Sequence, residues 1–283
     1  MAGGVAEEKA ALLMMRLSCL AVLSTFLGII GMVVWRGLPT LRLEMLFRTP
    51  SAGFYMGGGG GVLNAIVGSL LMAGVGTVIA VFMSIPVAFY LNVFAPRNSH
   101  LASAVRISLD LLCGIPSIVY GAFAFAVMLM AGLRASLACG TITLAVLCFP
   151  IMARAMDEVL RMVPRELAET SWSLGATRLE TALRVILRQA TPGLVSAAML
   201  SFGRAVGDAA SVLFAAGYSD RVPLAPTDPA ASLPLAIFFQ LGSPFPEVRD
   251  RAYAAALILT ILVVGVGLAA RRLSAARSRH VVR

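Results

Sequence analysis

The chain has 283 residues, of which 59% are hydrophobic and only 13% are charged, and its mean hydropathy is +0.89. A soluble domain is normally about a quarter charged, so this composition excludes an ordinary soluble protein and indicates an integral membrane protein. The net charge of +9 comes from basic residues that flank apolar segments, a pattern that indicates membrane topology rather than binding to nucleic acid.

Six apolar stretches are long enough to cross a bilayer, which takes about 20 helical residues. We expect transmembrane helices at residues 13–34, 63–94, 107–131, 135–153, 193–217 and 252–271. The predicted fold class is therefore all-α, a polytopic membrane protein with six transmembrane helices. Pro116 falls inside the third stretch and is expected to open its helical hydrogen-bond ladder.

The basic residues predict the orientation, because cytoplasmic segments of membrane proteins carry more lysine and arginine. With the N-terminus in the cytoplasm, most of the 23 basic residues fall on the cytoplasmic side, so both termini are expected there. The predicted organisation is a cytoplasmic tail at 1–12, the first transmembrane helix at 13–34, an extracytoplasmic loop at 35–62, a core domain at 63–272 and a basic cytoplasmic tail at 273–283. The run GGGGG at 57–61 lacks the lysine of a phosphate-binding loop, so we interpret it as an outer hinge.

A polar segment at 164–193, called the knob below, interrupts the apolar pattern on the cytoplasmic side. Pro164 suits a helix start, Gly175 suits a left-handed turn after a helix, and Thr177 with Glu180 has the spacing of a capping box. Pro192 is expected to close the second helix. The knob is thus predicted as helix, glycine, helix, a shape that fits a groove in a partner.

The chain lacks the sequence of a nucleotide-hydrolysing site. A P-loop needs a lysine after its glycines, and the only lysine is Lys9, which no glycine loop precedes. We therefore expect no catalytic residue and no enzyme activity from this chain. We also expect no metal site, since the four cysteines lie in apolar stretches without ligand spacing. ATP-driven work would need a separate ATPase, for which the knob is the expected attachment point.

The knob resembles the coupling loop of bacterial ABC importer permeases, whose pattern is E-A-A-x3-G-x9-I-x-L-P. Glu169, Gly175 and Leu187 match the acid, the glycine and the leucine at the right spacing. The departures are Thr170 and Ser171 for the alanines, Val185 for isoleucine and Arg188 for the final proline. The resemblance implies a type I ABC importer permease fold, with a coupling loop at about 164–192 made by Glu169, Thr170, Ser171, Gly175 and Leu187.

Four flanking motifs are similar to the phosphate-specific ABC importer permeases, and to their PstA-type subunit more than to the PstC-type partner. They are GIPSIVYG (114–121), GRAVGDAASVLFAAG (203–217), SLPLAIF (232–238) and RAYAAALILTILV (251–263). This resemblance implies a multi-pass protein of the bacterial inner membrane, paired with a PstC-type permease as a heterodimer. Two ATP-binding subunits, on which ATP and Mg²⁺ act, and an extracytoplasmic phosphate-binding protein complete the implied assembly. The chain itself is expected to bind no cofactor.

Arg204 and Asp208 are charges inside the predicted fifth helix, where each needs a partner or a water-filled path. Four residues apart on a helix they share a face, so one interpretation is a structural ion pair. The other is a substrate path, in which the arginine holds an oxyanion and the acid positions the arginine. The family pattern R-A-x-G-E, matched here with Asp208 for the glutamate, implies the second. Gly203 and Gly207 predict close packing of another helix.

Several alternatives stay open. The cargo is either phosphate or another oxyanion such as molybdate, tungstate or sulfate, and a different class, a secondary transporter or channel working without ATP, is the rival to an ABC permease. Tyr120 and Ser117 either line the path or make hydrogen bonds between helices, and Asp110 is interpreted as a helix-end carboxylate. Residues 232–242 predict a short interfacial or re-entrant helix on the outer side.

Overall fold

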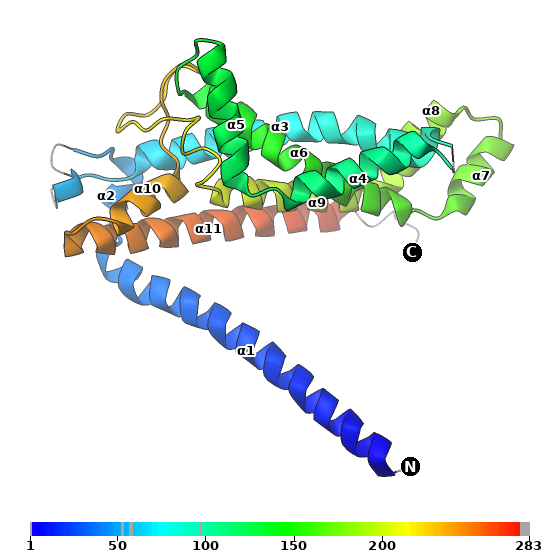
Figure 1. Ribbon diagram of the computed structural model, residues 1–283, viewed down its shortest axis with the longest axis horizontal. Coiled ribbons are helices and arrows are strands. Elements are labelled where there is room, and N and C mark those ends of the chain that lie inside the picture. The colour runs from blue at the N-terminus through cyan, green and yellow to red at the C-terminus, as the bar shows by residue number, and fades with distance from the viewer. Residues whose placement is uncertain (1, 52–53, 57–58, 97, 278–283) are drawn as a thin grey trace.

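The computed structural model describes residues 2–51, 54–56, 59–96 and 98–277, and these are mostly helical (Figure 1). The predicted all-α class is confirmed: the described residues form no β-strand, and only an isolated bridge joins Pro50 to Gly60. The elements are α1 (Ala2–Thr40), α2 (Leu43–Phe47), η1 (Phe54–Met56), α3 (Leu63–Phe89), η2 (Tyr90–Phe94), α4 (His100–Gly114), α5 (Ser117–Met130), α6 (Leu137–Arg161), α7 (Arg165–Ser173), α8 (Arg178–Glu180), η3 (Thr181–Ile186), α9 (Leu187–Gly207), α10 (Leu233–Leu241) and α11 (Pro246–Arg277). Several expected segments fall partly outside the described residues, among them the outer loop at 35–62 with its hinge at 57–61 and the basic tail at 273–283.

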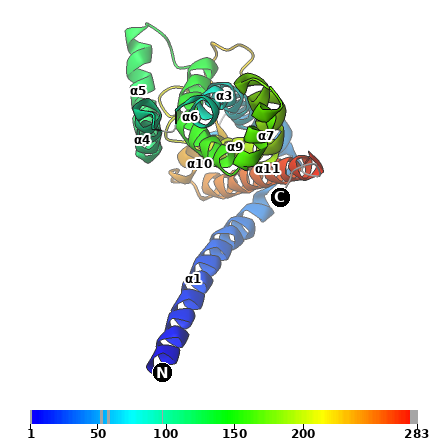
Figure 2. The ribbon, with the colours of Figure 1, turned by 90° about the vertical axis from the view of Figure 1, so that its right-hand side faces the viewer.

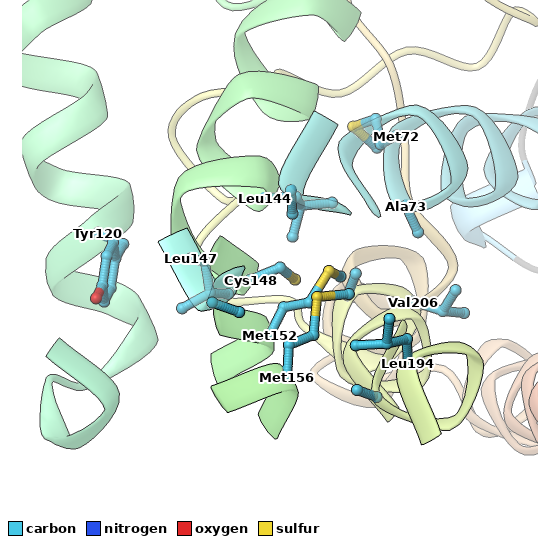
Figure 3. Packing of buried hydrophobic residues seen from close by; sticks show 14 of the residues in the cluster. Met72, Ala73, Tyr120, Leu144, Leu147, Cys148, Met152, Met156, Leu194 and Val206 are labelled. Atoms are coloured by element: carbon cyan, nitrogen blue, oxygen red, sulfur yellow. The ribbon is translucent and has the colours of Figure 1, made fainter. Parts of the chain in front are cut away.

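The bundle is built around α3 and α6, which pack against each other more extensively than any other pair, with α9 and α11 beside them (Figure 1). Small residues let the helices approach, as where the Cα of Gly68 lies directly against the Ala231 backbone carbonyl. Side chains from α3, α6 and α9 fill the centre, among them Met72, Leu144, Met152, Met156 and Leu194 (Figure 3). The knob lies at one end of this bundle and α2 and α10 lie at the other (Figure 1).

Five helices among the described residues are long and apolar enough to cross a membrane, and the bent pair α4 and α5 makes six if it is counted as one span. This pair replaces the continuous third helix that was expected at 107–131. The two helices meet at an angle of 99° because Pro116 has no amide hydrogen to continue the ladder. The Tyr120 hydroxyl donates to the Leu112 carbonyl across the break, at 3.0 Å, and so makes a hydrogen bond between the two helices.

The helix α1 diverges from the rest of the molecule (Figure 2). It approaches α11 near its C-terminal end, where Gly37 lies against the backbone of Tyr253 and the Arg36 guanidinium lies 5.3 Å from the Tyr253 ring centroid. None of its most apolar window is buried. In a membrane this surface faces lipid or another subunit.

The fifth predicted helix, 193–217, is wrong at its C-terminal end. The helix α9 stops at Gly207, and residues 208–217 are not helical, with turns over 210–216. The Asp208 carboxylate accepts a hydrogen bond from the Ala210 amide, a local contact that competes with helical geometry. The chain then returns through a loop to α10, which confirms a short helix at 232–242, capped by the Ser232 side chain.

Candidate functional site

The knob has the predicted helix–glycine–helix form. Pro164, the predicted first helical residue, is the N-cap of α7, so the helix begins one residue later than predicted, at Arg165. Gly175 has φ of +85°, a left-handed conformation that glycine adopts without strain. The predicted capping box is also present, since the Thr177 side chain accepts from the Glu180 amide and the Glu180 carboxylate accepts from the Thr177 amide.

Two hydroxyl groups join the two helices of the knob. Ser171 Oγ lies 2.9 Å from Oγ1 of the fully buried Thr181, so the residue that replaces a family alanine adds a hydrogen bond between the helices. Thr170 Oγ1 donates to the Glu166 carbonyl of its own helix, and Glu169 is exposed. Leu187, the remaining coupling-loop candidate, packs against the main hydrophobic core. Glu169 and Thr170 are therefore exposed, Ser171 connects the two helices of the knob, and Leu187 attaches the knob to the hydrophobic core.

The second helix of the knob does not end at Pro192, contrary to expectation. One helix runs from α8 through the π-helical turn η3 into α9, and Pro192 lies within it. A proline removes one backbone donor, and within a bundle neighbouring groups compensate for that loss. The second half of the knob and the span that carries Arg204 are consequently one continuous helical element of 30 residues, Arg178–Gly207.

Apolar side chains project from the knob into solvent. The exposed fraction is 84% for Leu174, 57% for Leu179 and 43% for Trp172. Leu174 directly precedes the glycine turn, at the tip between the two helices. Exposed apolar groups with a polar rim are typical of a docking surface for a partner protein.

Arg204 lies in the last turn of α9, at the edge of a hollow of about 550 Å³. The hollow is mostly apolar and is lined by α4, α6, α9 and α11, with Cys113, Phe202 and Val263 among its walls. Within the described chain the guanidinium has no hydrogen bond or ion pair, and Arg204 is exposed. An unpaired guanidinium beside an apolar hollow offers a planar fork to an oxyanion.

The ion pair considered between Arg204 and Asp208 does not form. Asp208 has left the helix with an extended backbone, and its Oδ2 atom is buried with no hydrogen-bond partner among the described residues. Within the described chain no other helix packs against Gly203 or Gly207, because a Cβ added at either would meet no neighbouring atom within 4 Å, so the close packing expected there stays a prediction for a partner helix. This face of α9 is therefore open.

A buried carboxylate, Asp157 of α6, was missed by the sequence reasoning. Asp157 and Arg161, and likewise Arg154 and Glu158, are four residues apart on α6, and both pairs form ion pairs. The spacing gave no sign that Asp157 is fully buried or that Arg106 and Asn92, distant in the sequence, bind it too. Asp110, interpreted as a helix-end carboxylate, pairs with Arg154 at 2.8 Å. One sequence feature could have indicated this cluster. Arg106 and Asp110 are four residues apart on α4, and both pair with charged residues of α6.

Residues 76–281 match the family model described as "Binding-protein-dependent transport system inner membrane component". The chain belongs to this family. It is 37% identical over 226 residues to "Phosphate transport system permease protein PstA 1" of Mycobacterium tuberculosis, covering 78% of this chain and 73% of the relative. It is 33% identical over 263 residues to "Phosphate transport system permease protein PstA" of Pasteurella multocida, covering 92% of each.

The fold is also similar to a solved permease structure. A chain of the MetNI methionine ABC transporter in an inward-facing conformation superposes with a TM-score of 0.63, covering 77% of this permease and 96% of that chain. The identity is 24%, so the likeness establishes the fold and nothing about cargo. The resemblance to PstA-type ABC permeases is confirmed. As a family member the chain is a multi-pass membrane permease that works with ATPase partner subunits and a permease partner.

Proposed function

We propose that this chain is the PstA-type membrane subunit of an ATP-driven importer that moves inorganic phosphate into the cell. The supporting observation is the similarity to PstA permeases over most of the chain, together with an unpaired Arg204 at an apolar hollow. A guanidinium binds a tetrahedral oxyanion through two parallel hydrogen bonds, and an apolar wall strengthens them by excluding water.

The proposed assembly places two ATP-binding subunits beneath the knob and a PstC-type permease beside this chain, with a phosphate-binding protein on the outer side. The exposed Leu174 and Trp172 suit an ATPase groove, and the open face of α9 suits a second permease. Both termini and the knob are proposed to be cytoplasmic, as the arginine distribution favours. The ATP and Mg²⁺ act on the ATPase subunits, so this chain contributes no catalytic residue and binds no cofactor of its own.

In this mechanism the continuous helix from Arg178 to Gly207 transmits the ATPase motion. ATP binding closes the two ATPase subunits and displaces the knob that is docked on them. Because no break separates the second half of the knob from α9, the displacement moves Arg204 as well. The hollow then becomes accessible from the opposite side of the membrane. Asp208 remains a proposed path residue through its buried Oδ2, independent of any pairing with Arg204.

Uptake by the reconstituted complex tests the cargo. Proteoliposomes that contain this chain with its ATPase, permease and binding-protein partners are supplied with labelled phosphate or labelled molybdate. ATP-dependent accumulation of phosphate is the expected result. Accumulation of molybdate without phosphate would assign another oxyanion, and phosphate uptake that is independent of ATP would assign a secondary transporter or channel.

Crosslinking tests the docking of the knob. A cysteine introduced at Leu174 is expected to crosslink to an ATPase subunit in membranes, because this side chain is 84% exposed at the tip of the knob. A cysteine at Leu224, which is 92% exposed in the loop between α9 and α10, is the matched control and is expected to give no such product. The reverse pattern would contradict both the docking and the proposed orientation.

A further inference from the structure

The carboxylate of Asp157 is the most highly coordinated charged group that the structure describes. Its side chain is 0% exposed. Its oxygens accept hydrogen bonds from Arg106 Nε at 3.1 Å, Arg154 Nη1 at 3.1 Å and Asn92 Nδ2 at 2.8 Å. Arg161 Nη2 forms an ion pair with the same carboxylate at 3.1 Å. A buried charge is tolerated only when such contacts replace water, and removing one partner leaves the others uncompensated.

This cluster joins three segments that are separate in the sequence. Arg106 comes from α4, Asn92 from η2, and Asp157 itself from α6. Arg106 Nη2 also donates to the Leu91 carbonyl at 3.0 Å, and Arg154 Nε pairs with Asp110 one helical turn further along α4. Polar contacts therefore hold α4 to α6 at two successive turns.

The rest of α4 is weakly attached. Its apolar contact with the bundle is a small cluster that includes Leu109 of α4 and Ala153 of α6. Its outer face is exposed, with exposed fractions of 57% for Ile107 and 69% for Leu111. The ion pairs thus supply a large part of what fixes α4 in place.

The two ends of this connection reach the knob and the hollow. Arg161, which binds Asp157, is the last residue of α6, and only residues 162–164 separate it from α7 of the knob. At the far end of α4, Cys113 forms part of the wall of the hollow that Arg204 lines. A contiguous connection therefore runs from the knob through Asp157 and α4 to a wall of the hollow that Arg204 also lines.

We propose that Asp157 is a positioning residue that makes α4 move with α6 when the knob is displaced, so that this wall of the hollow follows the ATPase. The inference rests on the proposed function for its transport readout only. Packed elements transmit coupling when they move as one unit, and the buried charge cluster provides that unit here. Arg204 lies on α9, and the Asp157 cluster fixes α4, which contributes Cys113 to the same hollow.

The test compares Asp157→Asn with Glu158→Gln in the complete reconstituted complex. Glu158 is the adjacent carboxylate and pairs with Arg154 of its own helix, so its loss leaves the link to α4 in place. For Asp157→Asn we expect phosphate transported per ATP hydrolysed to fall about fivefold or more, the lower range of measured coupling between sites. ATP hydrolysis itself is expected to continue, and Glu158→Gln is expected to keep the wild-type ratio. A wild-type ratio in Asp157→Asn, or an equal loss of transport and hydrolysis, would overturn the proposal.

Distance measurements supply a readout that does not depend on the cargo. Spin labels are placed at Leu101 of α4 and at Met162 after α6, both exposed, in a background without the four native cysteines. In the otherwise wild-type complex we expect one narrow distance distribution with and without ATP, and in Asp157→Asn a broader one. An unchanged distribution would overturn the proposal, even where the wild-type complex fails to move phosphate and the proposed function itself has failed.

Arg106→Gln serves as the second variant where Asp157→Asn does not assemble. It removes the contact between α4 and Asp157, while Arg154 and Arg161 still neutralise the buried carboxylate. The same broadening and the same lower transport per ATP are expected. Wild-type values for both would refute a role of this cluster in moving α4.

Discussion

Arg204 and Asp208 are four residues apart in the chain, yet a helix terminus separates them. Arg204 occupies the last turn of α9, whereas Asp208 is the C-cap with φ of −87° and ψ of 121°. The helical spacing that would bring the two side chains together is therefore lost, and the guanidinium remains free for a ligand at the hollow. We therefore expect phosphate uptake to depend on the unpaired guanidinium of Arg204.

Replacing Arg204 by alanine is expected to lower phosphate uptake about ten- to hundredfold, because hydrogen bonds to charged groups contribute about 1.5–3 kcal/mol. Arg204→Lys keeps the charge but loses the planar fork, so its uptake is expected to lie between that of the wild type and that of Arg204→Ala. Uptake is measured in cells with matched amounts of each protein. Arg221→Ala, in the loop between α9 and α10, is the control, and wild-type uptake by Arg204→Ala would remove Arg204 from the path.

Substitutions at Gly175 are expected to weaken ATPase attachment least for asparagine, more for alanine and most for valine. The residue has φ of +85° and no atom within 4 Å of an added Cβ, so the cost is conformational and amounts to about 1–2 kcal/mol for alanine. Co-purification of the ATPase with the tagged permease measures the effect. Gly265→Ala in α11 has the same open surroundings without the unusual φ and is expected to be silent. Equal behaviour of the two alanine variants would contradict the strained-turn explanation.

Two glycines of α3 are expected to respond to alanine in opposite ways. A Cβ at Gly68 would collide with the Ala231 carbonyl, whereas a Cβ at Gly74 would meet nothing within 4 Å. Gly68→Ala is expected to lower the free energy of unfolding by about 1–3 kcal/mol through overpacking. Gly74→Ala is expected to raise it by about 0.5–1 kcal/mol through helix propensity. Thermal unfolding in detergent compares them, and a Gly68→Ala protein as stable as wild type would show that the interface between α3 and residue 231 yields easily.

The loop between α9 and α10 is expected to loosen at low pH. Backbone amides of Ala225 and Leu224 donate to the Asp228 carboxylate and lower its pKa. A lowered folded pKa means that the stabilisation is present above the ordinary value of about 3.9 and is lost as the pH falls through the lower folded value. Protection of these two amides from hydrogen exchange is therefore expected to drop in Asp228→Ala at neutral pH.

The control for this loop is the pH itself. Below the folded pKa of Asp228, the wild-type protein is expected to show the same reduced protection as Asp228→Ala. Asp220→Ala, which changes an aspartate of the same loop, is expected to leave both amides protected at neutral pH. A wild-type loop that stays protected at low pH would assign its order to other contacts.

The knob was predictable because its signals are local. A glycine at a left-handed position, a capping box and a proline before the first helix each depend on a few adjacent residues, and Gly175 and Thr177 adopt the expected conformations. The helix end at Pro192 was wrong because tertiary contacts in the bundle support a helix through a proline. The early end of α9 was missed because the apolar pattern continues through residues that form turns.

Sequence alone determined the class and the family, since hydropathy and motif spacing are properties of adjacent residues. Only the tertiary structure decided that Asp157 is buried among Arg106, Arg154, Arg161 and Asn92, and that Arg204 and Asp208 part at a helix end. The linear sequence does not reveal which distant residue a charged side chain will pair with. Its energy depends on which groups the packed helices bring within about 3 Å and on how much water they exclude.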